Sequence, residues 1–207
     1  TARMAVAKKG ISEKSRTKQA EIIRCALEVF VQEGYAAVTL RRVADELGIS
    51  KGNLSYHFPN KNLLLGAVVE DFLRRYEEAH ENVISSFGSD VPGRMRSYLS
   101  FLVRDAQDTH SQGFFFQLWS MSSYRKDIAR YKDRVYEHFL AQLRIELSLA
   151  RPDLSKVVQI RKAFTIMSLL EGSNVLFSTS GKYLKQFGKM DDFLLEELLA
   201  IVFGQKA

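Results

Sequence analysis

Prolines are scarce in this chain, and their positions limit what it can fold into. Only Pro59, Pro92 and Pro152 occur among 207 residues, where average usage of about 5% would give roughly ten. Residues 93–151 and 153–207 therefore lack the residue that most strongly breaks a helix interior. Hydrophobic residues make up 46% of the chain, which is ample for a buried core. The sequence predicts an all-α fold of about nine helices, not a sheet with many turns.

Positive charge is concentrated in the first third of the chain. Residues 1–62 contain eleven Lys and Arg against six acids, whereas the remaining 145 residues contain nineteen against eighteen. A basic segment on a near-neutral body is typical of a head that binds a polyanion such as nucleic acid. A solubilising basic tail gives the same count, so charge alone leaves both interpretations open.

Metal binding and catalysis find no support in the residues. The single cysteine, Cys25, excludes an internal disulfide and is expected to be a small core residue. His57 has no His or acidic partner at helical spacing, and His80, His110 and His138 are scattered and expected at the surface. No phosphate-binding glycine loop or hydrolase motif occurs. We therefore predict no metal, no cofactor and no enzyme activity.

Membrane and secretion signals are also missing from the sequence. No apolar run approaches the roughly 18 residues that span a bilayer. The basic N-terminus lacks the apolar segment of a secretory signal. These features predict a cytoplasmic protein that does not enter a membrane.

Two short helices joined by a tight turn are predicted between residues 39 and 58. Thr39 is a good N-cap for an apolar stripe that ends at Gly48, and Ser50 is a second N-cap whose helix is ended by Pro59. An amphipathic helix over residues 18–34 precedes them. Two such helices around a glycine-containing turn form a helix-turn-helix unit.

The second short helix has one face for packing and one for a partner. Leu54 and Phe58 are expected to pack on the preceding helices because a helix this short cannot bury itself. The opposite face has no acid and many hydrogen-bond donors, which suits a phosphate-lined groove. It consists of Lys51, Gly52, Asn53, Ser55, Tyr56 and His57.

Longer helices are predicted in the rest of the chain from apolar periodicity and breakers. They cover residues 61–87, 90–108, 113–123, 126–149, 154–177 and 191–203, with a flexible segment at 178–189.

Several motifs follow one another within residues 26–61. They are Ala26-Leu-Glu-Val-Phe30, Gly34-Tyr35, Thr39-Leu-Arg-Arg-Val-Ala44, Leu47-Gly-Ile-Ser-Lys-Gly52 and Tyr56-His-Phe-Pro-Asn-Lys61. Together they resemble the N-terminal domain of the TetR family of bacterial transcriptional repressors. The resemblance implies an all-α homodimer that lies with the bacterial nucleoid. It also implies a flexible basic arm at 1–16, a helix-turn-helix DNA-binding domain at 17–62, and a ligand-binding and dimerisation domain at 63–207.

The resemblance also implies roles for individual residues. Thr39 and Lys61 would touch phosphate, Tyr56 and His57 would contact the DNA backbone, and the front of the recognition helix would meet the groove. Members often carry an aromatic or bulkier residue at the position of Ser55, so the base contact there is expected to differ. The expected DNA-binding residues are Thr39, Arg42, Ser50, Lys51, Gly52, Asn53, Ser55, Tyr56, His57 and Lys61.

An aromatic stretch at residues 114–119 has two interpretations. It is either plain core packing or, as the resemblance implies, part of the lining of a cavity for a small apolar or aromatic molecule. Glu171 is either a polar anchor in that cavity or an exposed or salt-bridged residue. The candidate ligand residues are Tyr98, Phe101, Phe114, Phe115, Gln117, Leu118, Trp119, Met121, Met167, Glu171 and Asn174.

The last two predicted helices carry more apolar residues than one body needs. Helices that are apolar all round are buried within a body or against a second copy. Two of them from each subunit would form a four-helix dimer interface. The candidate interface residues are Phe164, Leu176, Phe193, Leu194, Leu198 and Ile201.

The resemblance implies a ligand-responsive repressor that binds a palindromic operator as a dimer and is released by an apolar or aromatic effector. Two other hypotheses stay open at this point. The chain could be a similar regulator that activates or responds to a protein partner. It could also be an all-α enzyme that binds a small molecule.

Overall fold

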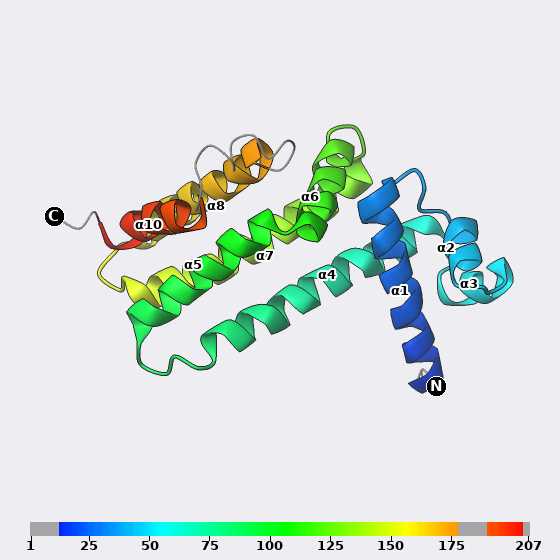
Figure 1. Cartoon of the computed structure of the whole chain (residues 1–207), viewed down its shortest axis with the longest axis horizontal. Coiled ribbons are helices and arrows are strands. Elements are labelled where there is room, and N and C mark those ends of the chain that lie inside the picture. The colour runs from blue at the N-terminus through cyan, green and yellow to red at the C-terminus, as the bar shows by residue number, and fades with distance from the viewer. Residues whose placement is uncertain (1–12, 178–189, 205–207) are drawn as a thin grey trace, which may run out of the picture. The chain divides into compact units, whose positions relative to one another are not determined.

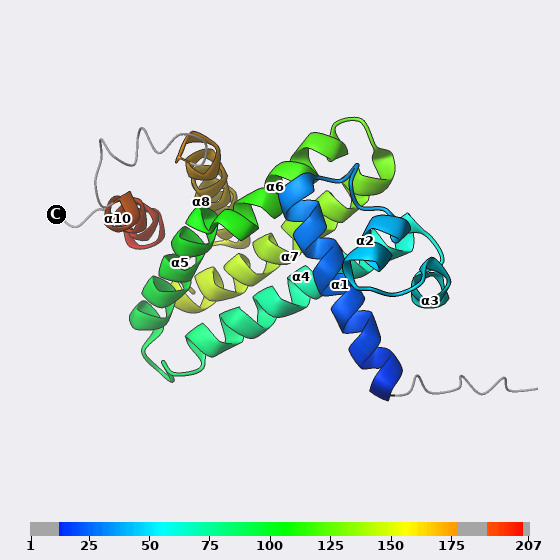
Figure 2. The same ribbon diagram turned by 45° about the vertical axis from the view of Figure 1, so that its right-hand side comes forward.

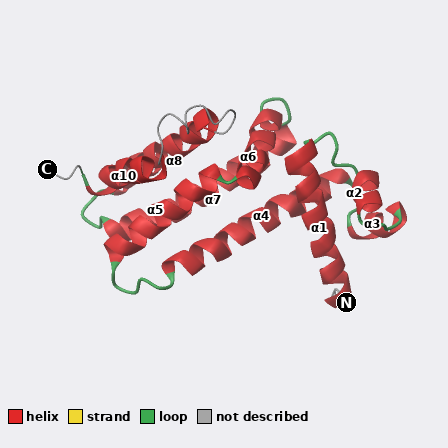
Figure 3. Cartoon of the chain, in the orientation of Figure 1, coloured by secondary structure: helices red, strands yellow, loops and turns green. Residues whose placement is uncertain are grey.

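The computed structural model describes residues 13–177 and 190–204, and every regular element in these ranges is an α-helix (Figure 3). The helices are α1 (Glu13–Glu33), α2 (Leu40–Glu46), α3 (Lys51–His57), α4 (Lys61–Ile84), α5 (Val91–Gln107), α6 (Thr109–Ser122), α7 (Lys126–Ala150), α8 (Lys156–Phe177) and α10 (Met190–Phe203) (Figure 1). The predicted all-α class is confirmed. None of these helices is long and apolar enough to cross a membrane.

The chain divides into two compact units, and the boundary lies between Val68 and Val69. This boundary falls inside α4, so the first turns of that helix belong to the first unit and the remainder to the second. The predicted boundary at residue 62 lies at the start of the same helix.

The first unit packs α1, α2 and α3 around a small apolar core. Its fully or almost fully buried side chains include Ile22, Ala26, Leu27, Phe30, Val43, Ala44, Leu54 and Leu64. Cys25, expected in this core, is only half-buried, and its Sγ lies 4.0 Å from the Val43 carbonyl oxygen.

Glycines and side-chain caps set where the short helices begin and end. Gly34 and Gly48 have φ angles of 85° and 63°, the left-handed region that favours glycine. The Thr39 hydroxyl accepts a hydrogen bond from the Arg42 amide at 3.0 Å, and the Ser50 hydroxyl accepts one from the Asn53 amide at 3.1 Å. The predicted N-caps of α2 and α3 are confirmed, and the short helices are therefore specified locally.

Some predicted helix ends were wrong. Residues 13–16, expected in a flexible arm, form the first turn of α1; residues 1–12, like the predicted flexible segment at 178–189, lie outside the described residues. Helix α6 begins at Thr109 and not at Gly113, because the Asp108 carboxylate accepts hydrogen bonds from the amides of His110 and Ser111 and so caps the helix earlier.

The second unit is a bundle in which α5 packs against α6, α7, α8 and α10, and α7 packs against α6 and α8 (Figures 1 and 2). Aromatic contacts attach α4 to this bundle. Phe72 stacks on Phe114 with ring centroids 3.9 Å apart. The Tyr76 ring lies 5.0 Å from that of Phe101 and 4.3 Å from that of Phe139. One face of α4 is therefore part of the aromatic core of the second unit.

A buried charge cluster ties α4, α5 and α7 together. Glu146 is 2% exposed and accepts two hydrogen bonds from the Arg94 guanidinium, at 2.6 and 2.7 Å. His80 Nε2 lies 3.5 Å from the same carboxylate, and its ring lies 4.4 Å from that of Tyr98. The expectation that His80 is a surface residue was wrong, because its side chain is 5% exposed and packs between Tyr98 and the Glu146 carboxylate.

Candidate functional site

Helix α3 buries one side and exposes the other. Leu54 is fully buried and Phe58 is 8% exposed, as the sequence predicted. Lys51, Gly52 and Asn53 are exposed at the N-terminal end, while the Tyr56 side chain is 82% exposed at the other end. Ser55 and His57 are half-buried on the same helix. Of the six predicted groove-facing residues of α3, four are therefore exposed and two are half-buried.

Gly52 has no structural need to be glycine. Its φ angle is not positive, and a Cβ added there would meet only the Ser50 hydroxyl, at 3.8 Å, an ordinary contact. Glycine within a helix destabilises it by roughly 0.5–1 kcal/mol relative to alanine. The described part of the fold therefore does not require glycine at this position.

Three other predicted DNA contacts already have partners within the first unit. The Arg42 guanidinium bridges Glu33, at 2.7 Å, and Glu46, at 2.5 Å, and these hydrogen bonds raise the pKa of Arg42. The Thr39 hydroxyl caps α2. The Lys61 ammonium donates to the Tyr35 carbonyl oxygen and lies over the Tyr35 ring. A phosphate would have to compete with these interactions or add to them.

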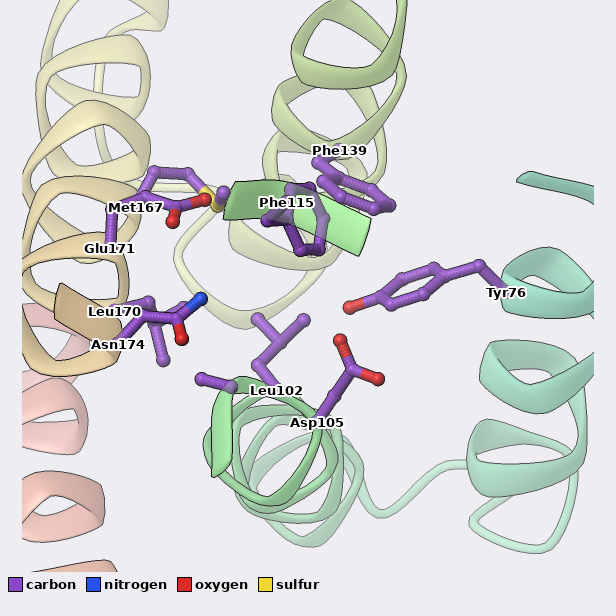
Figure 4. A pocket seen from close by; sticks show the side chains of 10 residues that line it. Tyr76, Leu102, Asp105, Phe115, Phe139, Met167, Leu170, Glu171 and Asn174 are labelled. Carbon is purple, nitrogen blue, oxygen red and sulfur yellow. The ribbon is translucent and has the colours of Figure 1, made fainter. Parts of the chain in front are cut away.

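The second unit contains a small pocket of about 30 Å³ (Figure 4). Helices α4, α5, α6, α7 and α8 each contribute to its wall. Its lining residues are Tyr76, Leu102, Asp105, Ala106, Phe115, Phe139, Met167, Leu170, Glu171 and Asn174. The pocket therefore combines an aromatic and aliphatic wall with two carboxyl groups and an amide.

A chain of hydrogen bonds runs from the Trp119 indole to Glu171 in the pocket wall. Trp119 Nε1 donates to the Tyr136 hydroxyl at 2.6 Å, and that hydroxyl donates to Glu171 Oε1 at 2.8 Å. On the opposite side, Asp105 Oδ1 accepts a hydrogen bond from the Ser111 hydroxyl at 2.7 Å. Both carboxyl groups are thus held in position by neighbouring side chains.

The surroundings of Glu171 and Asp105 raise the pKa values of both carboxyl groups. Burial raises the pKa of Glu171 to about 7; hydrogen bonds from Tyr136 and Asn174 oppose this rise, and the nearby Asp105 carboxyl adds to it. Burial also raises the pKa of Asp105 to about 6, partly offset by the hydrogen bond from Ser111. Groups with pKa values shifted in this way are enriched at functional sites.

Four of the eleven predicted ligand residues line this pocket: Phe115, Met167, Glu171 and Asn174. Glu171 therefore lines the pocket and is half-buried, not exposed. Among the others, Trp119 lies beside the lining residue Phe115 and is linked to Glu171 through Tyr136. Phe101 contacts Tyr76, and Gln117 is half-buried outside the lining. Four belong to the core and are fully or almost fully buried: Tyr98, Phe114, Leu118 and Met121.

Sequence reasoning missed several pocket residues, above all Tyr76, Asp105 and Phe139. Tyr76 and Phe139 belong to the apolar stripes of the helices predicted at 61–87 and 126–149, where an aromatic residue is indistinguishable from ordinary core packing. Asp105 had one usable signal, because it is an acid one turn after the buried Leu102 on an amphipathic helix.

The predicted interface residues fall into two groups. Phe164, Leu176 and Phe193 are 56%, 60% and 62% exposed, which is unusual for large apolar side chains. Leu194 and Leu198 are buried inside their own unit, at 7% and 0%, while Ile201 is half-buried. The exposed group lies on α8 and α10.

The fold and the α3 surface define a helix-turn-helix protein, and a family model matches this part of the chain. Residues 22–68 match the model described as "Bacterial regulatory proteins, tetR family". Over this segment the chain is similar to the TetR family, which consists of transcriptional regulators and not enzymes.

Curated relatives and a solved structure are similar to the chain as well. The chain is 35% identical over 95 residues to the HTH-type transcriptional repressor KstR2 of Mycolicibacterium smegmatis, covering 44% of this chain and 46% of that protein. It is 27% identical over 124 residues to the class D tetracycline repressor protein of Escherichia coli, covering 60% and 45%. A TetR transcription regulator from Haloarcula marismortui has a similar fold, with a TM-score of 0.72 and 16% identity over 90% of this chain and 97% of that one. Matches to curated relatives span between 26% and 62% of their lengths.

Proposed function

We propose that this protein is a cytoplasmic transcriptional repressor that binds a palindromic DNA operator as a homodimer and releases it when a small molecule enters the second unit. The α3 surface carries this proposal. It has no acid, is rich in hydrogen-bond donors, and leaves open space at Gly52 where the fold itself does not require glycine. A surface of this kind fits the floor and the phosphate walls of a DNA major groove.

Contacts from α3 and its neighbours divide into two kinds. Lys51 and Asn53 are exposed at the N-terminal end, the part of a recognition helix that reaches base edges, so they are assigned to base readout. Tyr56 is assigned to phosphate, because its hydroxyl is a donor at the far end of the exposed face. Lys61 neutralises phosphate charge from the first residue of α4.

The exposed apolar side chains of α8 and α10 support a homodimer. Phe164, Leu176 and Phe193 expose aromatic and aliphatic surface that monomeric proteins rarely leave in water. A second copy of the chain would cover it through a two-fold interface. The two α3 helices of such a dimer would bind half-sites about 34–36 Å apart, or a multiple of that spacing.

Helix α4 provides a route from ligand to DNA. Its residue Tyr76 lines the pocket, and its first residues belong to the first unit. A ligand that displaces Tyr76 would shift a helix that is continuous with Lys61. A coupling of about 1–3 kcal/mol between the two sites weakens DNA binding roughly 5- to 150-fold, which is enough to switch a promoter.

Selection of duplexes from a random library with the full chain, followed by fluorescence anisotropy, tests this function. We expect palindromic fragments whose affinity falls steeply with salt. Tyr56→Ala should weaken binding about tenfold or more, whereas Tyr124→Ala, which removes a 71% exposed tyrosine in the second unit, should not. Failure to select any duplex at low ionic strength, or equal effects of the two variants, would contradict the proposal.

A further inference from the structure

The pocket of the second unit contains two buried polar atoms without a hydrogen-bond partner, and both are acceptors. Glu171 Oε2 and Asn174 Oδ1 receive no hydrogen bond from the described parts of the chain. The Asn174 side chain is 4% exposed, and Figure 4 shows its amide directed into the pocket beside Glu171. An unsatisfied buried acceptor is costly, so a group that occupies this pocket should be a donor.

A second carboxyl group faces these acceptors from α5. Asp105 lines the same pocket, and only its Oδ1 is engaged by Ser111. The Asp105 carboxyl disfavours the ionised form of Glu171, as expected for two like charges in a site of low polarity. None of the described lining residues is Lys, Arg or His. The pocket thus has negative charge and acceptors but no positive partner.

The wall and the size of the pocket narrow the class of ligand. Tyr76, Phe115 and Phe139 present aromatic rings, whose faces attract cations. A volume of about 30 Å³ holds a head group about the size of one or two water molecules, so the body of a larger ligand must lie toward the opening or displace side chains. No group of three or more His, Cys, Asp or Glu in the described ranges is arranged to hold a metal ion.

We propose that this pocket binds the ammonium group of a small organic amine, with Glu171 and Asp105 as counter-charges and Asn174 Oδ1 as a third acceptor. A primary ammonium has three N–H donors and no acceptor, which suits the two acceptor atoms without a partner, Glu171 Oε2 and Asn174 Oδ1, and the Asp105 carboxyl that faces them. A neutral alcohol would satisfy fewer of these groups, and an anion would be repelled. The inference names the effector class of the proposed function, on which its regulatory meaning rests, and it replaces the apolar or aromatic effector expected from the sequence with a cationic one.

Calorimetric titration of the full chain with three matched probes tests this inference without DNA. The probes are benzylammonium, benzyl alcohol and benzoate, which share a phenyl body and differ in the charge of the head. At a pH above the pKa values of both carboxyl groups, benzylammonium should bind at least about tenfold more tightly than benzyl alcohol, and benzoate should not bind. Equal or tighter binding of the alcohol, or no binding of benzylammonium, would overturn the assignment.

Variants identify the site of binding. Glu171→Gln keeps the shape and removes the charge, so it should weaken benzylammonium about tenfold or more and leave benzyl alcohol unchanged. Asn174→Leu removes the third acceptor and should weaken the amine in the same direction. Glu137→Gln, an equal charge change at an exposed position of α7, is the control and should have no effect. If both Glu137→Gln and Glu171→Gln weakened benzylammonium binding equally, the effect would come from the net charge of the chain, and the site would be refuted.

The results that would refute the amine site differ from those that would refute the proposed repressor function. A chain that binds operator DNA but no benzylammonium retains its function and refutes the amine site. A chain that binds benzylammonium through Glu171 but selects no duplex refutes the repressor and leaves the amine site standing.

Discussion

The Lys61 ammonium nitrogen lies 3.4 Å from the centroid of the Tyr35 ring and donates a hydrogen bond to the Tyr35 carbonyl oxygen. The first residue of α4 is thereby fastened to the loop that follows α1. A lysine held over an aromatic ring is attracted to its face and loses less side-chain freedom when it also meets phosphate. Lys61 therefore has a structural role as well as the proposed DNA role.

Lys61→Met should affect stability and DNA binding together. Loss of the cation–π contact and the hydrogen bond should lower the free energy of unfolding by about 1–2 kcal/mol. DNA affinity should fall for all sequences alike. The slope of log affinity against log salt concentration should decrease by about one, the value of one phosphate contact. Lys51→Met is the matched control in denaturant unfolding and anisotropy, because Lys51 is exposed and should change sequence preference with little loss of stability.

Gly52→Ala should make the protein more stable and a poorer DNA binder. The new Cβ meets only the Ser50 hydroxyl, so helix α3 should gain roughly 0.5–1 kcal/mol in chemical denaturation. The same methyl group would intrude on the approach of DNA and reduce affinity in a gel-shift titration. Gly172→Ala, at a helical position with open space in α8, should gain similar stability without loss of DNA affinity. An unchanged affinity in Gly52→Ala would show that α3 does not approach DNA closely at this point.

The two neighbouring arginines of α5 should differ sharply in their contribution to stability. Arg94→Ala leaves the buried Glu146 carboxylate without its guanidinium partner, and such losses cost about 3–5 kcal/mol. Arg96→Ala removes an ion pair to Glu196 in which the side chains are 48% and 60% exposed, so it should cost less than about 1 kcal/mol. Thermal unfolding of both variants measures the difference, and similar melting temperatures would contradict the role of the cluster.

Protonation of Glu171 should make stability depend on pH near neutrality. Its pKa is raised from 4.5 to about 7 in the folded chain, so the folded chain binds this proton more tightly than the unfolded chain does. Protonation of Glu171 therefore stabilises the fold, and this stabilisation is fully present below about pH 4.5. That contribution, up to about 3 kcal/mol, is lost as the pH rises through 7. The groups that face Glu171 are Asp105, Tyr136, Asn174 and Tyr76.

Denaturant unfolding between pH 5 and 8 checks this dependence. Glu171→Gln should make the profile less steep, because the amide carries no proton to lose in this range; the remaining slope comes from Asp105, whose pKa is raised to about 6. Glu137→Gln should retain the wild-type profile, since its side chain is exposed. A wild-type profile that rises with pH across this interval would be the wrong sign and would refute the assignment.

Sequence patterns predicted the first unit well because its determinants are local. Thr39, Ser50 and Pro59 bound two short helices within twenty-odd residues, and the exposed face of α3 follows from which of its residues are apolar. Residues that cap or break a helix act on the turn next to them, so their effect can be inferred without tertiary structure.

The pocket could not be predicted in the same way, since five helices contribute to it. Successive residues of a helix point about 100° apart, so Phe114, Phe115 and Phe116 point in different directions. Phe115 reaches the pocket, Phe114 stacks on Phe72, and the Phe116 ring lies against Trp119. Which aromatic faced the cavity depended on where α4 and α7 pack, and no local pattern records that.

The hydrogen bond from the indole to Tyr136 also has a practical consequence. Trp119 is the only tryptophan in the chain, and one hydroxyl separates it from the Glu171 carboxylate. Indole emission responds to the charge and polarity around the ring, so any event that neutralises or discharges this carboxylate should alter the colour or the brightness of the light it emits. Trp119 is therefore a native fluorescent reporter next to the pocket. Ligand entry into the pocket can be followed through it without an attached dye or label.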